Sequence, residues 1–586
     1  MARIFSRWIV FVLAIPVFGA RPAWADEPAA DADQAIVDLY KSGKLFDKRE
    51  YKAVRAAFAH QFEQKHQSEI QNAYGEDTEQ LTAWLKDRPD IKESFYTALN
   101  EKYDNVEAAL RLFKELWKQF PEQVDKYSNV AIATTVTWDD PRGVYNYRGH
   151  QLRTKSSLPT ASTGATDNFK YLVDNDKAFQ GRIQLLPWEF LVLLVDHRTP
   201  FDERKWSQSN YQSKRVMVGR CYKEVPYDHE LLNGNTPHLS GQVYTLENIR
   251  RYGGVCAHQA DFAARVAKSL GIPAAFVGGQ ADTLGLHAWV MWVEFKQVTK
   301  TQIQFTLESF GRYLGDHYYT GELLDPQTGQ KILDRDLERR LSVVGHDRVA
   351  KRQADLIMRA YSLISDQRKL NVTERVSYLD QCLRVSGHNE EAWLELAQLA
   401  KNGDLKPAHL PTVSFHLNNL FKTFALYPDF VWKIFDDLLT VQPSVSEKAR
   451  RYEQLVAMDE QAGRPDLACG ARLKLAELQC EQKKWKTAAN GLAFTIKKFP
   501  SEGRYVPRLM EKLQEVCANY KGGTDLLAQF YLDVLPSIPG KRGNKPSQYC
   551  IKMYEQAIAF FKENHKDKVV PALEAELARV KNGQRK

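Results

Sequence analysis

The sequence predicts an α+β multidomain protein in which a mixed central unit lies between two helical regions. Three observations carry this prediction. Apolar residues recur at helical spacing from about residue 31 to 136, alternate in strand fashion between about 287 and 307, and return to helical spacing after residue 341. At 586 residues the chain is too long for one hydrophobic core, so we expect two to four domains.

The first 25 residues have the composition of a signal peptide. Arg3 and Arg7 precede an apolar stretch from Trp8 to Ala20, and Ala23-Trp24-Ala25 is an A-x-A cleavage signal. We therefore expect a mature chain that is secreted or periplasmic; an uncleaved anchor is the alternative. The apolar stretch is short for a bilayer, and no later stretch reaches 18 apolar residues, so no stable membrane span is predicted.

Composition and charge argue against a nucleic-acid partner. Apolar residues make up 44% of the chain and charged residues 26%, as in ordinary globular proteins. Removing residues 1–25 takes away three arginines and no acid, which lowers the formal net charge from +8 to +5. Because basic blocks interleaved with aromatic residues are lacking, nucleic acid is not an expected partner.

The N-terminal region, residues 26–150, is predicted to be helical. Asp104 or Asn105 can cap a helix that stops before Pro121. A further buried helix is expected from Leu185 to Asp196, at the start of the central unit assigned to residues 168–340.

In the central unit, one helix and several strands can be placed. The helix begins near Cys256, with Gly271 at its C-cap and Pro273 as its stop. Short strands follow at 274–277, 287–295 and 302–308, and apolar residues alternate in the second and third of them. A helix followed by antiparallel strands is an α+β arrangement.

The C-terminal region, residues 345–580, is predicted to form helical hairpins that resemble tetratricopeptide repeats. Trp393, Leu396 and Ala397 have the spacing of a first repeat helix. A second candidate unit has Leu475, Ala476, Ala488, Leu492 and Pro500. Its glycine between helices is missing, because Lys483 or Lys484 stands there. Such an array would offer a concave surface to a protein partner; an irregular helical bundle is the alternative.

Cys256 is the candidate nucleophile. It follows Gly253 and Gly254, which let the backbone turn sharply, and it opens a helix. The free amides and positive dipole end at a helix N-terminus favour thiolate over thiol and can stabilise an oxyanion. By contrast, Cys382, Cys469, Cys480 and Cys517 lie in helical patterns typical of buried residues.

His287 is the candidate acid and base, because it opens an alternating strand and an imidazole can exchange a proton with a thiol. If the two longest strands pair about a turn near 298–300, Glu308 or Ser309 is level with His287. Glu308 is therefore the expected group that orients the imidazole, with Asp325, in Leu-Asp-Pro, as the alternative.

These motifs together resemble the transglutaminase-like superfamily. The resemblance rests on Gly-Val-Cys-Ala-x-x-Ala at 254–260, Leu-Gly-Ile-Pro-Ala at 270–274 and His-Ala-Trp-Val at 287–290. It implies a papain-like Cys-His-Asp triad on a helix and an antiparallel sheet. The chain departs from the family where Glu308 stands in the place of the usual Asp, which puts the third triad member in doubt.

No cofactor or metal is predicted, because the sequence has no C-x-x-C pair, no H-x-x-x-H pair and no glycine-rich phosphate loop between strand and helix. The leading expectation is an exported thiol enzyme that acts on amide bonds through an acyl-thioester on Cys256. Hydrolysis of a peptide or peptidoglycan-like substrate is favoured over amine transfer, because water needs no acceptor site. The alternative is a catalytically inactive transglutaminase-like module in a protein-interaction scaffold.

Overall fold

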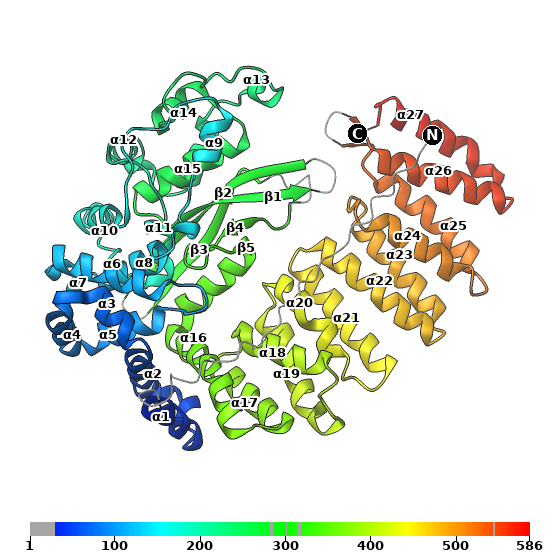
Figure 1. Cartoon of the computed structure of the whole chain (residues 1–586). Coiled ribbons are helices and arrows are strands. Elements are labelled where there is room, and N and C mark those ends of the chain that lie inside the picture. Colours follow the sequence, from blue (N-terminus) through cyan, green and yellow to red (C-terminus); the bar gives the residue numbers. More distant parts are fainter. Residues whose placement is uncertain (1–29, 282–284, 300–301, 313–317, 543–544, 586) are drawn as a thin grey trace, which may run out of the picture.

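The computed structural model describes residues 30–281, 285–299, 302–312, 318–542 and 545–585. The expected signal peptide at 1–25 lies outside these residues. Among the helices of the described ranges, none combines the length and apolar character needed to cross a membrane. The chain forms a helical N-terminal part, a small antiparallel sheet with its covering helices, and a long helical C-terminal part (Figure 1). The predicted α+β fold class is therefore confirmed.

Short helices build the N-terminal part. They are α1 (Ala30–Lys41), α2 (Tyr51–Lys65), α3 (Gln67–Tyr74), α4 (Thr78–Lys86), α5 (Pro89–Ala98), α6 (Val106–Gln119), α7 (Pro121–Lys126) and α8 (Ser128–Trp138). Of the two predicted caps for α6, Asn105 is the one used, because its side chain accepts from the backbone N–H of Ala108 at 3.1 Å. Pro121 opens α7, so the predicted stop of α6 is also observed.

In the central part, the described residues form seven helices, of which α9 and α13 are very short, and a five-stranded sheet. The helices are α9 (Arg148–Arg153), α10 (Ala165–Asp174), α11 (Trp188–Val195), α12 (Phe201–Tyr211), α13 (His229–Leu232), α14 (Leu246–Tyr252) and α15 (Cys256–Ser269). The strands are β1 (Ala274–Ala281), β2 (Gly285–Val298), β3 (Ile303–Phe310), β4 (Glu322–Leu324) and β5 (Lys331–Leu333), in the order β3-β2-β1-β4-β5 with every pair antiparallel.

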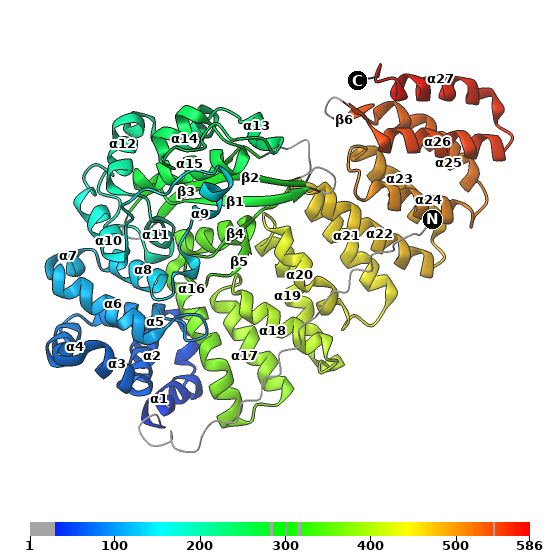
Figure 2. The ribbon, with the colours of Figure 1, turned by 45° about the horizontal axis from the view of Figure 1, so that its top comes forward.

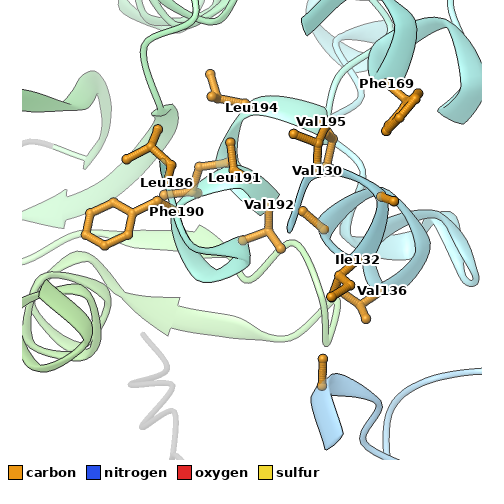
Figure 3. Close-up of a cluster of buried hydrophobic side chains, with 14 of the residues drawn as sticks. Val130, Ile132, Val136, Phe169, Leu186, Phe190, Leu191, Val192, Leu194 and Val195 are labelled. Atoms are coloured by element: carbon orange, nitrogen blue, oxygen red, sulfur yellow. The ribbon is translucent and has the colours of Figure 1, made fainter. Parts of the chain in front are cut away.

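The two faces of the sheet bury different partners. Val290 and Trp292 pack under α15, together with Ala263 and Val266 of that helix. The other face joins the N-terminal helices through α8 and α11, whose apolar side chains interdigitate in Figure 3. Phe190 of α11 meets the ring of Phe305 on β3 edge to face, with centroids 5.1 Å apart. The N-terminal helices and the sheet therefore share one core.

Helical hairpins follow the sheet to the end of the described chain (Figure 2). The helices are α16 (Asp334–Arg368), α17 (Val372–Val385), α18 (Glu390–Lys401), α19 (Leu410–Thr423), α20 (Pro428–Leu439), α21 (Val445–Gln461), α22 (Pro465–Glu481), α23 (Trp485–Lys498), α24 (Val506–Cys517), α25 (Gly523–Val534), α26 (Gln548–Glu563) and α27 (Val570–Lys581), with a two-residue ribbon of β6 (Lys541–Arg542) and β7 (Lys545–Pro546). The predicted limit between 340 and 345 falls inside α16, near a kink at Asp347. We call α17 to α27 the helical array.

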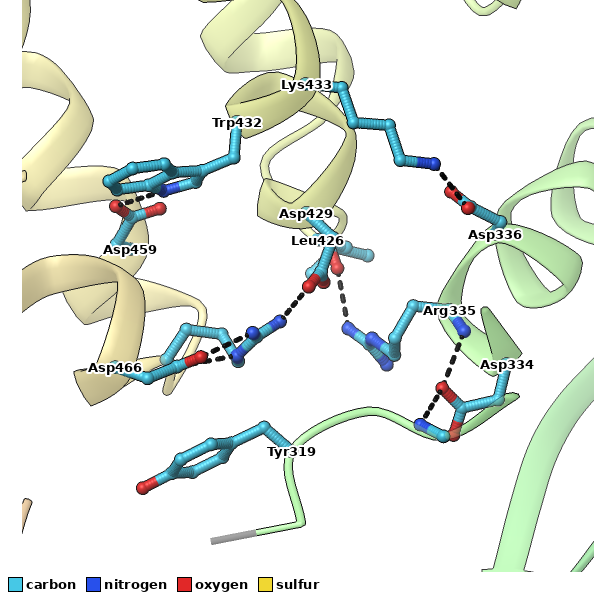
Figure 4. A network of polar contacts seen from close by, with 12 residues as sticks. Tyr319, Asp334, Arg335, Asp336, Leu426, Asp429, Trp432, Lys433, Asp459 and Asp466 are labelled. Atoms are coloured by element: carbon cyan, nitrogen blue, oxygen red, sulfur yellow. Dashed lines mark hydrogen bonds and ion pairs between the residues drawn. The ribbon is translucent and has the colours of Figure 1, made fainter. Parts of the chain in front are cut away.

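Polar contacts join the array to α16 and to the segment between β3 and β4 (Figure 4). Lys433 of α20 pairs with Asp336 at 2.6 Å, and Arg335 donates to the carbonyl of Leu426 at 2.7 Å. Further along, the hydroxyl of Tyr319 donates to Glu502 at 3.0 Å. The segment after β3 therefore contacts the array at two separate places.

Candidate functional site

Cys256 is the first residue of α15, and the turn before it is fixed by close backbone contacts. Gly253 has φ +87° and ψ −172°, a conformation reserved for glycine, and a Cβ there would collide with the carbonyl of Pro226. Gly254 donates to that same carbonyl at 3.0 Å and accepts from the N–H of Asp228 at 3.1 Å. The predicted role of the two glycines therefore has a direct structural basis.

The thiol of Cys256 is partly exposed, whereas most other cysteines are buried. All seven lie in the described residues, and none forms a disulfide. Burial raises the pKa of Cys221 and of Cys382 well above the usual value, and raises that of Cys517 to about 11. Burial also raises the pKa of Cys480, the other partly exposed cysteine. Since a buried, protonated thiol is a poor nucleophile, Cys256 at the start of α15 is the thiol best placed to react.

A buried stripe of polar side chains holds α15 in place. Asp261 accepts from the hydroxyls of Tyr145 at 2.8 Å and Tyr244 at 3.0 Å. Arg265 donates to Glu203 at 2.7 Å. Burial alone would lower the pKa of Arg265, but the carboxylates of Glu203 and Asp261 raise it overall. One turn further on, Lys268 is paired with Asp196. These contacts tie α15 to the segments around residues 145, 200 and 244.

His258, two residues after Cys256, is fully buried and completes that stripe. Its Nδ1 accepts from the backbone N–H of Val255 at 3.2 Å, and its Nε2 donates to the carbonyl of His150 at 3.1 Å. Burial lowers the pKa of His258 to about 4, so the ring is neutral. His258 therefore serves the cap of α15.

His287 is near the start of β2 and opposite Gly279 of β1. Its Nε2 donates to the carbonyl of Gly311 at 2.5 Å, and its ring contacts Trp289 and Tyr318, with centroids 6.0 and 5.4 Å away. By the strand alternation His287 belongs with Trp289 and Met291, whose side chains lie in the core opposite α15.

Helix and strand geometry predicts how far the start of α15 lies along the sheet. The 14 residues of α15 span roughly 20 Å at about 1.5 Å per residue, and β1 returns along the helix at about 3.3 Å per residue. From these rises we expect the thiol of Cys256 near the end of β1 that contains Gly279, the residue paired with His287. Among the hydrogen bonds of the described residues, however, none joins the two side chains.

The expected register that brought Glu308 level with His287 is wrong. Glu308 pairs with Trp292, and Ser309 pairs with Met291. The strands run further into the turn than the sequence suggests, since Val298 still pairs with Ile303, and an irregularity between Phe295 and Gln297 shifts the register again. Glu308 is thus displaced along β2 from His287. Because it is opposite Trp292, it belongs to the face of the sheet that α15 covers.

Asp325, the alternative third member, lies in the turn between β4 and β5. Its Oδ1 accepts from the backbone N–H groups of Gln327 and Thr328, each at 3.0 Å, and its Oδ2 pairs with Arg340 at 3.3 Å. Both oxygens therefore serve the turn and its link to α16. Among the hydrogen bonds and ion pairs of the described residues, none joins Asp325 to His287.

Other features of the described residues do not add a cofactor site. Within those ranges, no group of three or more His, Cys, Asp and Glu side chains is arranged to hold a metal ion. Cavities of about 410 and 390 Å³ lie where the N-terminal helices meet α16, and neither is lined by Cys256 or His287.

Sequence reasoning missed four groups that shape the site. Asp261 and Arg265 are spaced as a solvent-facing helix stripe would be, and their buried partners are far away in sequence. The carbonyl of Gly311 belongs to the backbone and gives no signal in the sequence. Tyr222, whose hydroxyl donates to the carbonyl of Ala288 at 3.0 Å, lies in a turn-rich segment with no recognisable motif.

Comparison with protein families matches residues 203–300 to the transglutaminase-like superfamily. The matched stretch contains Cys256 and His287 and ends before Glu308 and Asp325. Neither the curated proteins nor the solved structures give a match. The resemblance seen in the sequence is therefore confirmed for the central part of the chain.

Proposed function

We propose that the transglutaminase-like region is a thiol enzyme that cleaves amide bonds, with Cys256 as its nucleophile. The observation that supports this most is the position of Cys256: it is partly exposed, at the first turn of α15, and preceded by a turn that only glycine can form. Helix-end amides stabilise a thiolate and can donate to the oxyanion that forms when the thiolate attacks a carbonyl.

In the proposed reaction, Sγ of Cys256 bonds to the carbonyl carbon as its proton passes to His287. The C–N bond then breaks, the proton moves from the imidazolium to the leaving nitrogen, and an acyl-thioester remains. Water attacks the thioester and gives up a proton through His287 to the departing thiolate, which regenerates Cys256 and releases an acid. An amine in the place of water would give transfer; we favour hydrolysis, because water needs no acceptor site.

The substrate class that fits this chemistry is a peptide or a peptidoglycan-like amide. We further propose that the enzyme works outside the cytoplasm, on the strength of the signal-like residues 1–25. The helical array is proposed to bind a protein partner, because stacked helical hairpins offer extended surfaces for this purpose.

A second candidate is a non-catalytic module within an interaction scaffold. One observation favours it: by the strand alternation His287 belongs to the face of the sheet opposite α15, and both Glu308 and Asp325 are placed or engaged elsewhere. In this case the transglutaminase-like region would be retained for its shape.

A trapping experiment separates the two. The full mature chain is incubated with a library of peptides and muropeptide-like amides, with and without hydroxylamine, and products are identified by mass spectrometry. The proposal predicts free acids in water, hydroxamates with hydroxylamine, and an acyl adduct on Cys256. Cys256→Ala must abolish all three, while Cys480→Ala, a change at the other partly exposed cysteine, must leave them unchanged. A library without any Cys256-dependent product favours the non-catalytic module.

A further inference from the structure

Tyr222 connects the two backbone segments that flank His287. It lies in the 3₁₀ segment Val218–Glu224 and is 5% exposed. Its hydroxyl donates to the carbonyl of Ala288, the residue after His287 on β2, at 3.0 Å. Its ring meets Phe310, the last residue of β3, edge to face with centroids 6.0 Å apart. The side chain therefore bridges β2 and the end of β3.

Gly311 is the point at which Tyr222 and His287 meet. Its φ of +96° turns the chain away from β3, in a region of backbone conformation that favours glycine. A Cβ at this position would lie 2.7 Å from Cζ of Tyr222, so the tyrosine ring fills the space of a side chain there. The carbonyl of the same glycine accepts from Nε2 of His287 at 2.5 Å. The ring of Tyr222 thus packs against Gly311, whose carbonyl accepts the hydrogen bond from the imidazole of His287.

We infer that Tyr222 is a positioning residue that acts through Gly311 to set the orientation and tautomer of His287. An N–H of Nε2 held by a backbone carbonyl leaves Nδ1 as the nitrogen that takes up a proton. The backbone carbonyl of Gly311 does not titrate, so it can accept the hydrogen bond from Nε2 across the pH range. This inference rests on the proposed function, in which His287 is the acid and base.

The chain offers a matched control for such a role. Tyr378 of α17 is also buried, and its hydroxyl also donates to a backbone carbonyl, that of Ile357, at 2.6 Å. It lies in the helical array, away from His287. A general loss of stability from removing a buried tyrosine hydroxyl would appear in both variants, whereas an effect on His287 belongs to Tyr222 alone.

The test is nitrogen-detected side-chain NMR of the full mature chain labelled with ¹⁵N-histidine, with the His287 signals assigned by His287→Gln. We expect His287 to be the Nε2–H tautomer in the unmodified protein and in Tyr378→Phe. In Tyr222→Leu the two tautomers should mix and the midpoint of His287 titration should move by at least ~0.5 pH unit, an about threefold change in proton affinity. Tyr222→Phe, which keeps the ring, should move it less and in the same direction.

Unchanged His287 signals in Tyr222→Phe and Tyr222→Leu overturn the inference, and so does an Nδ1–H tautomer in the unmodified protein. If Tyr222→Leu does not fold, Tyr222→Phe alone decides, because its ring still fills the space at Gly311. The proposed function is tested separately by alkylation of Cys256 in His287→Ala. If the rate of alkylation of Cys256 does not change in His287→Ala, the proposed function is refuted. The tautomer measurement still tests the role of Tyr222 in that case.

Discussion

Helix α15 and helix α22 of the array are both buried, but they are held by different forces. In α22 the buried positions are mostly small or apolar, among them Ala468, Cys469, Leu475 and Ala476. In α15 the stripe of His258, Asp261, Arg265 and Lys268 is buried as well, and each side chain has a polar partner on another segment. Apolar contact is non-directional, whereas these hydrogen bonds fix the helix in one position. The helix that carries the candidate nucleophile is thus the more precisely placed of the two.

The largest change in stability is expected when Arg265 is removed from this polar stripe. Arg265→Met leaves Glu203 and Asp261 buried without their cation, and it should lower the free energy of unfolding by about 3–5 kcal/mol. The matched change in the array is Arg384→Met, which removes an exposed pair with Asp380 and should cost less than about 1 kcal/mol. Urea denaturation of both variants gives the comparison. Equal losses would mean that α15 depends on its polar contacts no more than an array helix does.

Gly253→Ala should have the next largest effect. The position combines a conformation reserved for glycine with a clash against the carbonyl of Pro226, so we expect a loss of about 1–3 kcal/mol or more. Gly403→Ala in the array also has a positive φ, of +75°, but meets nothing within 4 Å, and should cost only about 1 kcal/mol. Thermal melts of the pair isolate the contribution of the turn before Cys256. A harmless Gly253→Ala would remove the argument that this turn is tightly determined.

The array also contains a pH-sensitive group. Burial raises the pKa of Asp459 to about 8 from an ordinary value of 3.8, and its Oδ2 accepts from the indole N–H of Trp432 at 3.1 Å. Since the folded state holds this proton more tightly than the unfolded state, its contribution to stability is complete below about pH 4 and is lost as the pH rises through about 8. Asp459→Asn should therefore gain stability relative to the parent between pH 5 and pH 9.

The melting temperatures of Asp459→Asn and the parent, measured at pH 5 and pH 9, check this expectation. Asp436→Asn, at an exposed acid of α20 that pairs with Lys474, serves as the control. A parent protein whose stability relative to Asp459→Asn is the same at both pH values would contradict it.

The smallest expected effect is a gain in stability at the helix turn where the repeat-like unit lacks its glycine. Lys483 adopts φ +59°, the left-handed conformation that glycine favours after a helix. Lys483→Gly should therefore raise the free energy of unfolding by up to about 1 kcal/mol, and Lys484→Gly, with φ −87°, should lower it. Loss of stability in Lys483→Gly would show that the left-handed turn costs this chain nothing.

The sequence was informative where local chemistry decides the structure. The predicted start of α15 at Cys256 and its stop before Pro273 are observed, with Gly271 at φ +68°, because capping and left-handed turns depend on neighbouring residues. The three predicted strands are also observed, as β1, β2 and β3, and the alternation of apolar residues identified the second and third of them.

Long-range pairing was beyond such reasoning. The register of β2 and β3 extends to the pair Val298 and Ile303 and shifts between Phe295 and Gln297, and neither feature has a distinct sequence signal. Likewise Glu203, the partner of Arg265, and Asp196, the partner of Lys268, lie more than 60 residues from them, so these side chains look like a solvated helix face in the sequence. The catalytic assignments of Cys256 and His287 stay predictions.

The most direct test of the account is the pH dependence of iodoacetamide alkylation at Cys256, read by mass spectrometry beside the other six cysteines, in the mature chain and in His287→Ala. We expect Cys256 to be alkylated faster than the other six cysteines, and to lose that advantage in His287→Ala. Alkylation of Cys256 that is no faster than that of Cys480 and does not respond to His287→Ala would contradict the proposed Cys-His chemistry and leave the non-catalytic module as the better explanation.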